Sequence, residues 1–197
     1  MSYSRAFIYN IALNCLGLSA TVQNVNQTDA AATVLNNFYE MARNQVLKDF
    51  DWNFANAYRE LASTGNTPEN PKYLYEFDYP NDCIQAREVL DSMGNSVKFS
   101  IASTLSGQQV ICANILPAKL RYTRIVTKEA FFSVDFILAL GTYLAGLCAL
   151  AITGSQEKEK LNFQKYQFML NKAKYLNASE GVSITEKELL STWIDER

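Results

Sequence analysis

The stretch GNTPENPKYLYEFDYPND, Gly65–Asp82, decides the fold of this chain, because it contains three of the four prolines in the sequence. The fourth, Pro117, also lies in the middle third. Proline lacks the backbone N–H that helices and central strands need, so it concentrates in turns and at strand edges. The prolines therefore mark residues 65–127 as a region of turns and short strands between two flanks without proline.

Short segments with strand character alternate with turn signals in this region. The candidate strands are Tyr73–Phe77, Ile84–Leu90, Val97–Ala102, Gln109–Ala113 and Lys119–Val126. Turn residues such as Pro80-Asn81-Asp82 and Ser106-Gly107 separate them. The pattern predicts a small antiparallel sheet or sandwich, and residues 56–64 fit either a strand or an extended arm. Such a unit buries little surface alone, so we expect it to lean on the helices or on a neighbouring subunit.

The flanks have helical periodicity. Residues 4–16 and a segment from the predicted N-cap Thr28 to about residue 50 each place apolar side chains on one face. A third helix is expected from about residue 130 to 153. After the two-residue break Gly154-Ser155, a fourth helix has apolar positions that include Leu161, Tyr166 and Phe168. So short a break predicts an antiparallel helical hairpin.

These signals predict an α+β fold, in which the N- and C-terminal flanks form an antiparallel helical bundle around a small antiparallel β insertion. The predicted domains are a helical body from residues 1–64 and 128–180, a β insertion domain from 65–127, and a C-terminal docking arm from 181–197. In the arm, four apolar side chains cluster on one side, and we predict that they contact a partner: Leu189, Leu190, Trp193 and Ile194. The alternative is a disordered tail.

Residues 136–152 carry no charge, so a membrane anchor is an alternative for the third helix. Their number is at the lower limit for crossing a hydrocarbon core of roughly 30 Å. Small and polar residues dilute the apolar stretch, and its flanks lack an asymmetry of positive charge. We therefore predict a buried helix, whose small residues let other helices approach closely within the chain and between subunits.

Residues with catalytic chemistry are scarce in this sequence. It contains no histidine, which excludes mechanisms that use histidine as a general base. The four cysteines are far apart and lie among apolar neighbours, so they are predicted to be reduced and buried: Cys15, Cys83, Cys112 and Cys148. Phosphate-binding and nucleophile motifs are absent. We predict that the protein is not an enzyme and that it binds no cofactor and no metal ion.

Two groups of charged residues leave alternatives open. Asp78 and Asp82 flank Pro80, as turn residues do, but two carboxylates are also what a small hydrolase of the glycosidase type uses. The main basic cluster contains Lys119, Arg121 and Arg124, and the first two alternate on one strand face. This cluster is either a solvated face, or part of a DNA channel wall or of a salt bridge between subunits. The net charge of −2 argues against nucleic-acid binding as the main function.

Several short motifs occur together in a recognisable order. They are Asn14-Cys15-Leu16-Gly17, Trp52-Asn53-Phe54-Ala55, the stretch Tyr75–Cys83, Leu120-Arg121-Tyr122-Thr123, and Phe131-Phe132 before the alanine-rich helix with its Gly154-Ser155 turn. Over about residues 5–178, their order and spacing resemble those of the tail tubular protein A family. The members of that family are the head-to-tail adaptors of short-tailed bacteriophages.

The resemblance implies a ring, typically of twelve copies, docked below the portal protein. The helices would form the ring body, and the β insertion would point to the next tail component, the nozzle or the fibres. DNA would pass through the lumen without sequence-specific binding. The resemblance also implies a structural protein without catalytic residues or cofactors, made in the cytoplasm of the host bacterium and located in the virion tail, with no membrane partner. The segment around Trp193 matches no motif of the family, so its partner is open.

Overall fold

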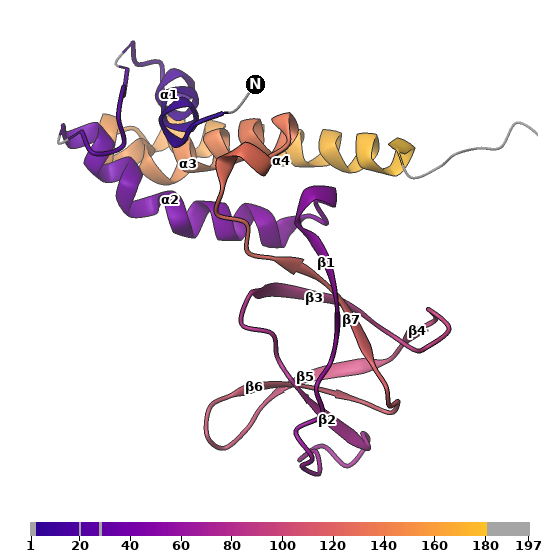
Figure 1. Ribbon diagram of the computed structural model, residues 1–197. Coiled ribbons are helices and arrows are strands. Elements are labelled where there is room, and N and C mark those ends of the chain that lie inside the picture. The colour runs from indigo at the N-terminus through magenta and orange to yellow at the C-terminus, as the bar shows by residue number, and fades with distance from the viewer. Residues whose placement is uncertain (1–2, 20, 28, 181–197) are drawn as a thin grey trace, which may run out of the picture.

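The computed structural model describes residues 3–19, 21–27 and 29–180. Within these residues the chain forms two parts, a layer of four α-helices and a β unit of seven short strands that projects from it (Figure 1). The helices are α1 (Arg5–Cys15), α2 (Ala30–Asp49), α3 (Val134–Thr153) and α4 (Gln156–Glu180). The chain leaves the helical layer after α2 and returns before α3. This is the α+β class that the sequence predicts.

Local signals set the ends of most helices. The hydroxyls of Ser4, Ser133 and Ser155 each accept a hydrogen bond from the backbone N–H three residues later, which caps α1, α3 and α4. Gly17 and Gly154 follow α1 and α3 with φ of 72° and 67°, a left-handed conformation that glycine adopts without strain. The Gly154-Ser155 turn joins α3 and α4 as the predicted hairpin.

The start of α2 differs from the prediction. Thr28, the predicted N-cap, lies outside the described residues. Asp29 occupies the N-cap position, and its side chain makes no capping hydrogen bond. Its carboxylate therefore supports α2 only through its charge near the positive end of the helix dipole.

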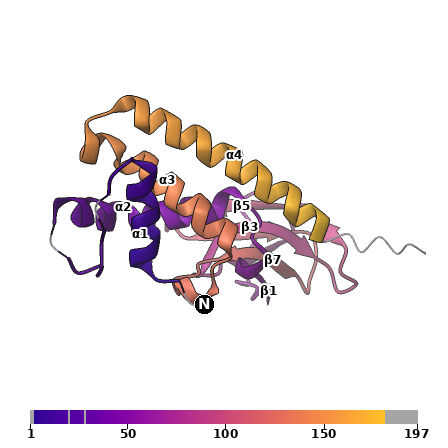
Figure 2. The ribbon, with the colours of Figure 1, turned by 90° about the horizontal axis from the view of Figure 1, so that it is seen from above.

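Helix α3 is the centre of the helical layer and contacts α1, α2 and α4. Seen from above, α4 runs alongside α3 and α1 crosses it (Figure 2). Glycines make the close approach possible. A Cβ at Gly141 would lie 2.5 Å from Cγ2 of Ile11 in α1, and one at Gly146 would lie 3.0 Å from the ring of Phe163 in α4. The small residues thus serve contacts within the chain, and a role between subunits stays a prediction.

The β unit consists of two antiparallel sheets. Its strands are β1 (Asn56–Glu60), β2 (Tyr75–Asp78), β3 (Cys83–Leu90), β4 (Ser96–Val97), β5 (Phe99–Ser103), β6 (Gln109–Ala113) and β7 (Lys119–Arg124). One sheet has the order β1-β7-β3-β4 and the other β2-β6-β5. All five predicted strands occur, but the predicted strand Val97–Ala102 is divided between β4 and β5, because the chain crosses from one sheet to the other at Lys98.

Strand β1 corrects the predicted domain boundary at residue 64. It pairs with β7 along its whole length, from Asn56 opposite Thr123 to Glu60 opposite Lys119. The ambiguous residues 56–64 therefore enter the β unit at Asn56. The sequence gives no turn signal at this boundary, because β1 follows a short 3₁₀ turn that contains no proline or glycine.

Each of the two parts has its own hydrophobic core. In the β unit, Phe77 and Ile111 of one sheet pack against Leu120 and Tyr122 of the other. The core of the helical layer is larger and draws on all four helices. The two parts meet at the end of α2.

Candidate partner interface

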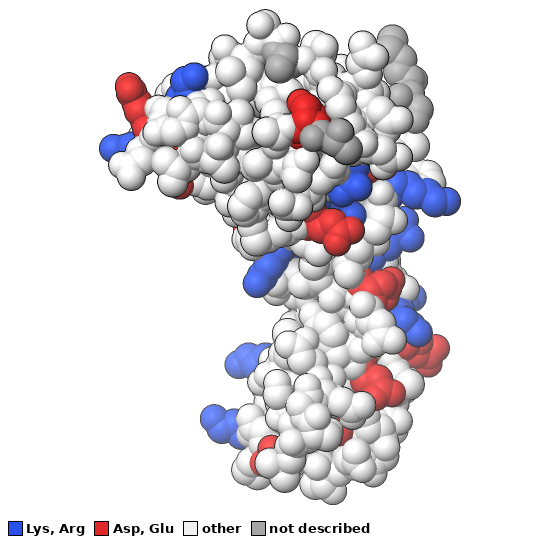
Figure 3. All heavy atoms as spheres, turned by 90° about the vertical axis from the view of Figure 1, so that its left-hand side faces the viewer, with Lys and Arg blue, Asp and Glu red and all other residues white. Residues whose placement is uncertain are grey.

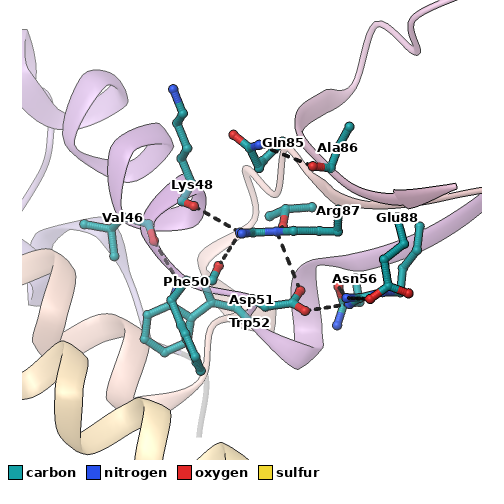
Figure 4. A network of polar contacts seen from close by, with 12 residues as sticks. Val46, Lys48, Phe50, Asp51, Trp52, Asn56, Gln85, Ala86, Arg87 and Glu88 are labelled. Carbon is teal, nitrogen blue, oxygen red and sulfur yellow. Dashed lines mark hydrogen bonds and ion pairs between the residues drawn. The ribbon is translucent and has the colours of Figure 1, made fainter. Parts of the chain in front are cut away.

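An ion-pair network joins the β unit to the end of α2 (Figure 4). Arg121 of β7 places Nη1 2.5 Å from Oδ2 of Asp51 and Nη2 2.9 Å from Oε1 of Glu88. The Arg121 side chain is only 18% exposed. Asp51 comes just after α2 and Glu88 lies in β3, so one guanidinium connects the helical layer with two strands.

A second arginine, Arg87, reaches α2 directly. The register between β3 and β7 is irregular around Arg87, and such a bulge turns the extra residue out of the regular alternation. Its guanidinium donates to the carbonyl oxygens of Lys48 (3.0 Å) and Phe50 (2.8 Å) and to Oγ1 of Thr123 (2.9 Å). The last carbonyls of a helix lack intrahelical partners and carry the negative end of its dipole. Arg87 therefore caps α2 from the β unit.

Both arginines remain charged at the junction. Burial lowers the pKa of Arg87, and the nearby Asp51 carboxylate acts against that shift. Burial alone would also lower the pKa of Arg121, but its hydrogen bonds to Asp51 and Glu88 outweigh burial and raise the pKa. Neither guanidinium group therefore loses its positive charge near neutral pH.

Aromatic packing supports the junction from the helical side. Trp52 is almost fully buried, and its Nε1 donates to the carbonyl oxygen of Val46 at 2.8 Å. Its ring lies edge-on to Phe50 and Phe136, at centroid distances of 4.8 and 5.1 Å. Phe54 extends the cluster toward α3. The motif Trp52–Ala55 is thus the anchor that fixes where the chain leaves the helical core.

The three predicted basic residues do not form a common surface. Lys119 and Arg124 are exposed, and strand alternation places them on opposite faces of β7. The ammonium of Lys119 lies 5.9 Å from the ring centroid of Tyr58. The surroundings of Arg121 differ from the predicted channel wall or salt bridge between subunits. Its guanidinium forms ion pairs with Asp51 and Glu88 of its own chain.

The predicted partner contacts of the C-terminal arm lie outside the described residues, so the assignment of Leu189, Leu190, Trp193 and Ile194 stays a prediction. The described part of α4 shows an exposed position that the sequence pattern missed. Phe168 is 71% exposed, whereas Tyr166 and Leu170 of the same helix are buried. The predicted apolar stripe mixed the two faces of α4, although the spacing of Tyr166, Leu170 and Ala173 alone marks the inner one.

A cavity of about 780 Å³ opens in the β unit beside β1, β2 and the loop before β6. Glu76, which is buried, lines it and accepts a hydrogen bond from Oγ1 of Thr64 at 2.9 Å. Asp78 also lines the cavity. Asp82 does not, and its carboxylate accepts a hydrogen bond from the Tyr122 hydroxyl instead. The two aspartates of the hydrolase alternative therefore have different surroundings.

The cysteines are free, and three of the four are buried. Burial raises the pKa of the Cys148 thiol to about 12, which keeps it protonated and unreactive. In the described part of the chain, no group of three or more cysteine and acidic side chains is placed to bind a metal ion.

Helix α3 is long and apolar enough to cross a membrane by length and composition alone. Its most apolar window is 61% buried inside the protein. The helices α1, α2 and α4 bury it, as expected for the central helix of a helical layer.

The chain matches no model of a known protein family, and a search of curated proteins gave no match. The likeness to the tail tubular protein A family therefore rests on the motifs and their order.

Proposed function

We propose that this protein is a structural head-to-tail adaptor of a short-tailed bacteriophage, assembled as a ring below the portal. The junction is the observation that carries this proposal. Arg87 and Arg121 fix a β unit against a helical layer through hydrogen bonds to the end of α2. A protein that connects two different rings needs such a fixed angle between its two binding parts, whereas a tethered pair of independent domains needs none.

The surface of the helical layer suits contacts between copies. Figure 3 shows broad uncharged areas on this part, with charges of both signs near the narrow region between the two parts. Several large apolar side chains of the layer are exposed: Phe7, Met41, Phe131, Val134 and Leu138. Exposed apolar area supports protein association. A head-to-tail contact that closes on itself gives a ring, for which the family resemblance implies about twelve copies.

The β unit offers a separate surface for the next tail component. Leu74, Leu105 and Leu116 lie in its loops with more than half of each side chain exposed. Strand β5 is an edge strand of its sheet, with backbone groups available to a partner. The tail nozzle and the tail fibres are the partners that the resemblance implies for this end.

The charge distribution fits a lumen through which DNA slides. Two exposed basic residues of β7 lie on opposite faces, and the chain as a whole is slightly acidic. Tight binding of DNA needs several phosphate contacts from one positive surface. DNA would therefore pass through the lumen without tight binding and without sequence-specific recognition.

The mass of the detergent-free protein tests the proposal. We expect light scattering over a range of concentrations to find one large species near twelve subunits, and electron microscopy to show a central hole. Monomers at every concentration, with no binding to portal rings, would contradict the proposal. Recovery only in detergent would favour the membrane alternative for residues 136–152.

A carboxylate-dependent hydrolase is the second candidate, because Glu76 and Asp78 line the same polar cavity. Its test is turnover of chromogenic glycosides by the wild-type protein and by Glu76→Gln and Asp78→Asn. Turnover that both substitutions abolish would favour the hydrolase. An inactive wild type that forms rings would eliminate it.

A further inference from the structure

Helix α4 exposes a stripe that the described chain leaves uncovered. Leu161 and Phe168 are 45% and 71% exposed and lie seven residues, or two helical turns, apart. Lys165 lies between them and Lys172 one turn beyond, both exposed. We call these four residues the α4 stripe. Its two apolar side chains alternate with two positive charges along one face.

The sequence after α4 complements this stripe. Residues 181–197 contain the apolar positions Leu189, Leu190, Trp193 and Ile194, which helical spacing would place on one side. The same segment has four acidic and two basic side chains. An apolar side flanked by acidic residues matches apolar residues flanked by lysines, both in burial and in charge.

The course of α4 favours a neighbouring copy as the stripe's partner. Figure 1 shows the C-terminal end of α4 extending past the start of α3, beyond the edge of its own helical layer. The described helix therefore ends, at Glu180, outside its own layer. For residues 181–197, their own α4 stripe ends at Lys172, eight residues before the end of the helix, so the segment would have to reverse its direction after Glu180 to dock on it.

We infer that residues 186–194 of one copy dock on the α4 stripe of the next copy, with Trp193 against Phe168 and the acidic residues toward Lys165 and Lys172. This inference rests on the proposed ring and names one of its contacts. The contact joins the end of one copy to the middle of another, so it is heterologous and can continue around a ring. Buried aromatic residues are the usual energetic centres of such contacts.

Two full-length variants test the docking by complementation. Phe168→Glu disables the stripe, and Leu190→Asp combined with Trp193→Asp disables the segment. Each alone should associate about thirtyfold more weakly than wild type, the effect of losing a central aromatic anchor. Mixed together, each supplies what the other lacks. We expect one-to-one heterodimers that grow no further, because both remaining ends are disabled. Native mass spectrometry of differently labelled chains measures this directly.

Met93→Glu is the matched control. Met93 is 87% exposed in the β unit and belongs to neither proposed surface, so the same change from apolar to acidic should leave association unchanged. Thermal unfolding checks that every variant is folded. A second pair does not depend on Phe168: Lys165→Glu with Lys172→Glu should weaken association, and Glu186→Lys with Glu188→Lys on the partner copy should restore it.

The outcomes separate this inference from the adaptor proposal. Rings that form equally well in both variants would overturn the docking and leave the adaptor standing. Variants that are monomeric alone and form no heterodimers when mixed would also overturn it, and would point to docking within one chain. Heterodimers in the mixture, without closed rings of the wild type, would support the docking and count against the ring.

Discussion

The helical layer and the β unit differ in how they are stabilised. The layer has a continuous apolar core with contributions from all four helices. Serine side chains cap the N-terminal ends of most of these helices. The β unit has a smaller core between two short sheets. The charged side chains of Arg87 and Arg121 connect it to the end of α2. We therefore expect the layer to be stable by its own packing and the β unit to depend on the junction.

The entry and exit of the β unit reinforce this dependence. The chain enters through β1 and leaves through β7, and these two strands pair with each other over five residues. Both connections therefore run side by side from the layer, as one paired ribbon. With Arg121 attached to this ribbon, a movement of the β unit has to break the ion pairs as well as bend two strands.

Trp52→Ala should have the largest effect, because it removes the anchor that both parts share. Truncating a buried tryptophan destabilises a protein by about 3–5 kcal/mol. The loss of ring contacts to Phe50 and Phe136 should lower the free energy of unfolding of the whole chain, measured by urea denaturation. Trp52→Phe, which keeps most of the packing, should cost less than half as much. Equal effects of the two variants would contradict an anchoring role.

Arg121→Met should act on the two parts unequally. It leaves Glu88 without its ion-pair partner and Asp51 with only the longer contact to Arg87 at 3.9 Å, which destabilises by about 2–3 kcal/mol at a partly buried site. Hydrogen exchange should show faster opening of the amides in β3 and β7, with α3 unchanged. Arg124→Met, an exposed arginine of the same strand, should stay within about 0.5 kcal/mol of wild type. Equal protection of both parts in Arg121→Met would show that the β unit is stable without the junction.

Gly141→Ala should destabilise the helical layer without changing the β unit. Its new methyl group would lie 2.5 Å from Cγ2 of Ile11, a branched side chain next to the backbone that cannot swing away. The overpacking exceeds the gain in helix propensity, so we expect a net loss of about 1–2 kcal/mol. Gly146→Ala is the comparison, because the ring of Phe163 can shift slightly. Thermal melts of the two variants that coincide would refute the close approach of α1 to α3.

How far the sequence predicts the structure also differs between the two parts. Helix ends depend on neighbours in sequence. The glycine at 154 agrees with the predicted end of α3, whereas the Ser133 cap starts the helix at Val134, four residues after the predicted start. The bulge at Arg87 depends on the register with β7, which no local pattern encodes. The partner of Arg121 is likewise distant, because Asp51 lies seventy residues away along the chain.

The exposed surfaces illustrate the same limit. A helical pattern identifies apolar residues, but Phe168 and Tyr166 look alike until the packing of α4 on α3 selects the inner face. Residues 56–64 are ambiguous in the sequence, because β7, the strand with which β1 pairs, lies at the other end of the insertion. The residues that join the parts and those that face partners were therefore the least predictable, since both depend on contacts between distant segments.

The stability that ionisation of Cys148 alone removes at alkaline pH should be the smallest effect, and it belongs to the helical layer. Burial raises the pKa of Cys148 from 9.0 to about 12. A raised pKa means that the folded protein favours the neutral thiol, so this contribution is complete below pH 9 and is lost as pH rises toward 12. We expect Cys148 to account for about 1 kcal/mol of the stability lost by pH 10. Urea denaturation of Cys148→Ala should therefore show a shallower decline than wild type between pH 9 and 11. Identical slopes would mean that the thiol ionises without opening α3, and the layer would then be less tightly packed around Cys148 than its burial indicates.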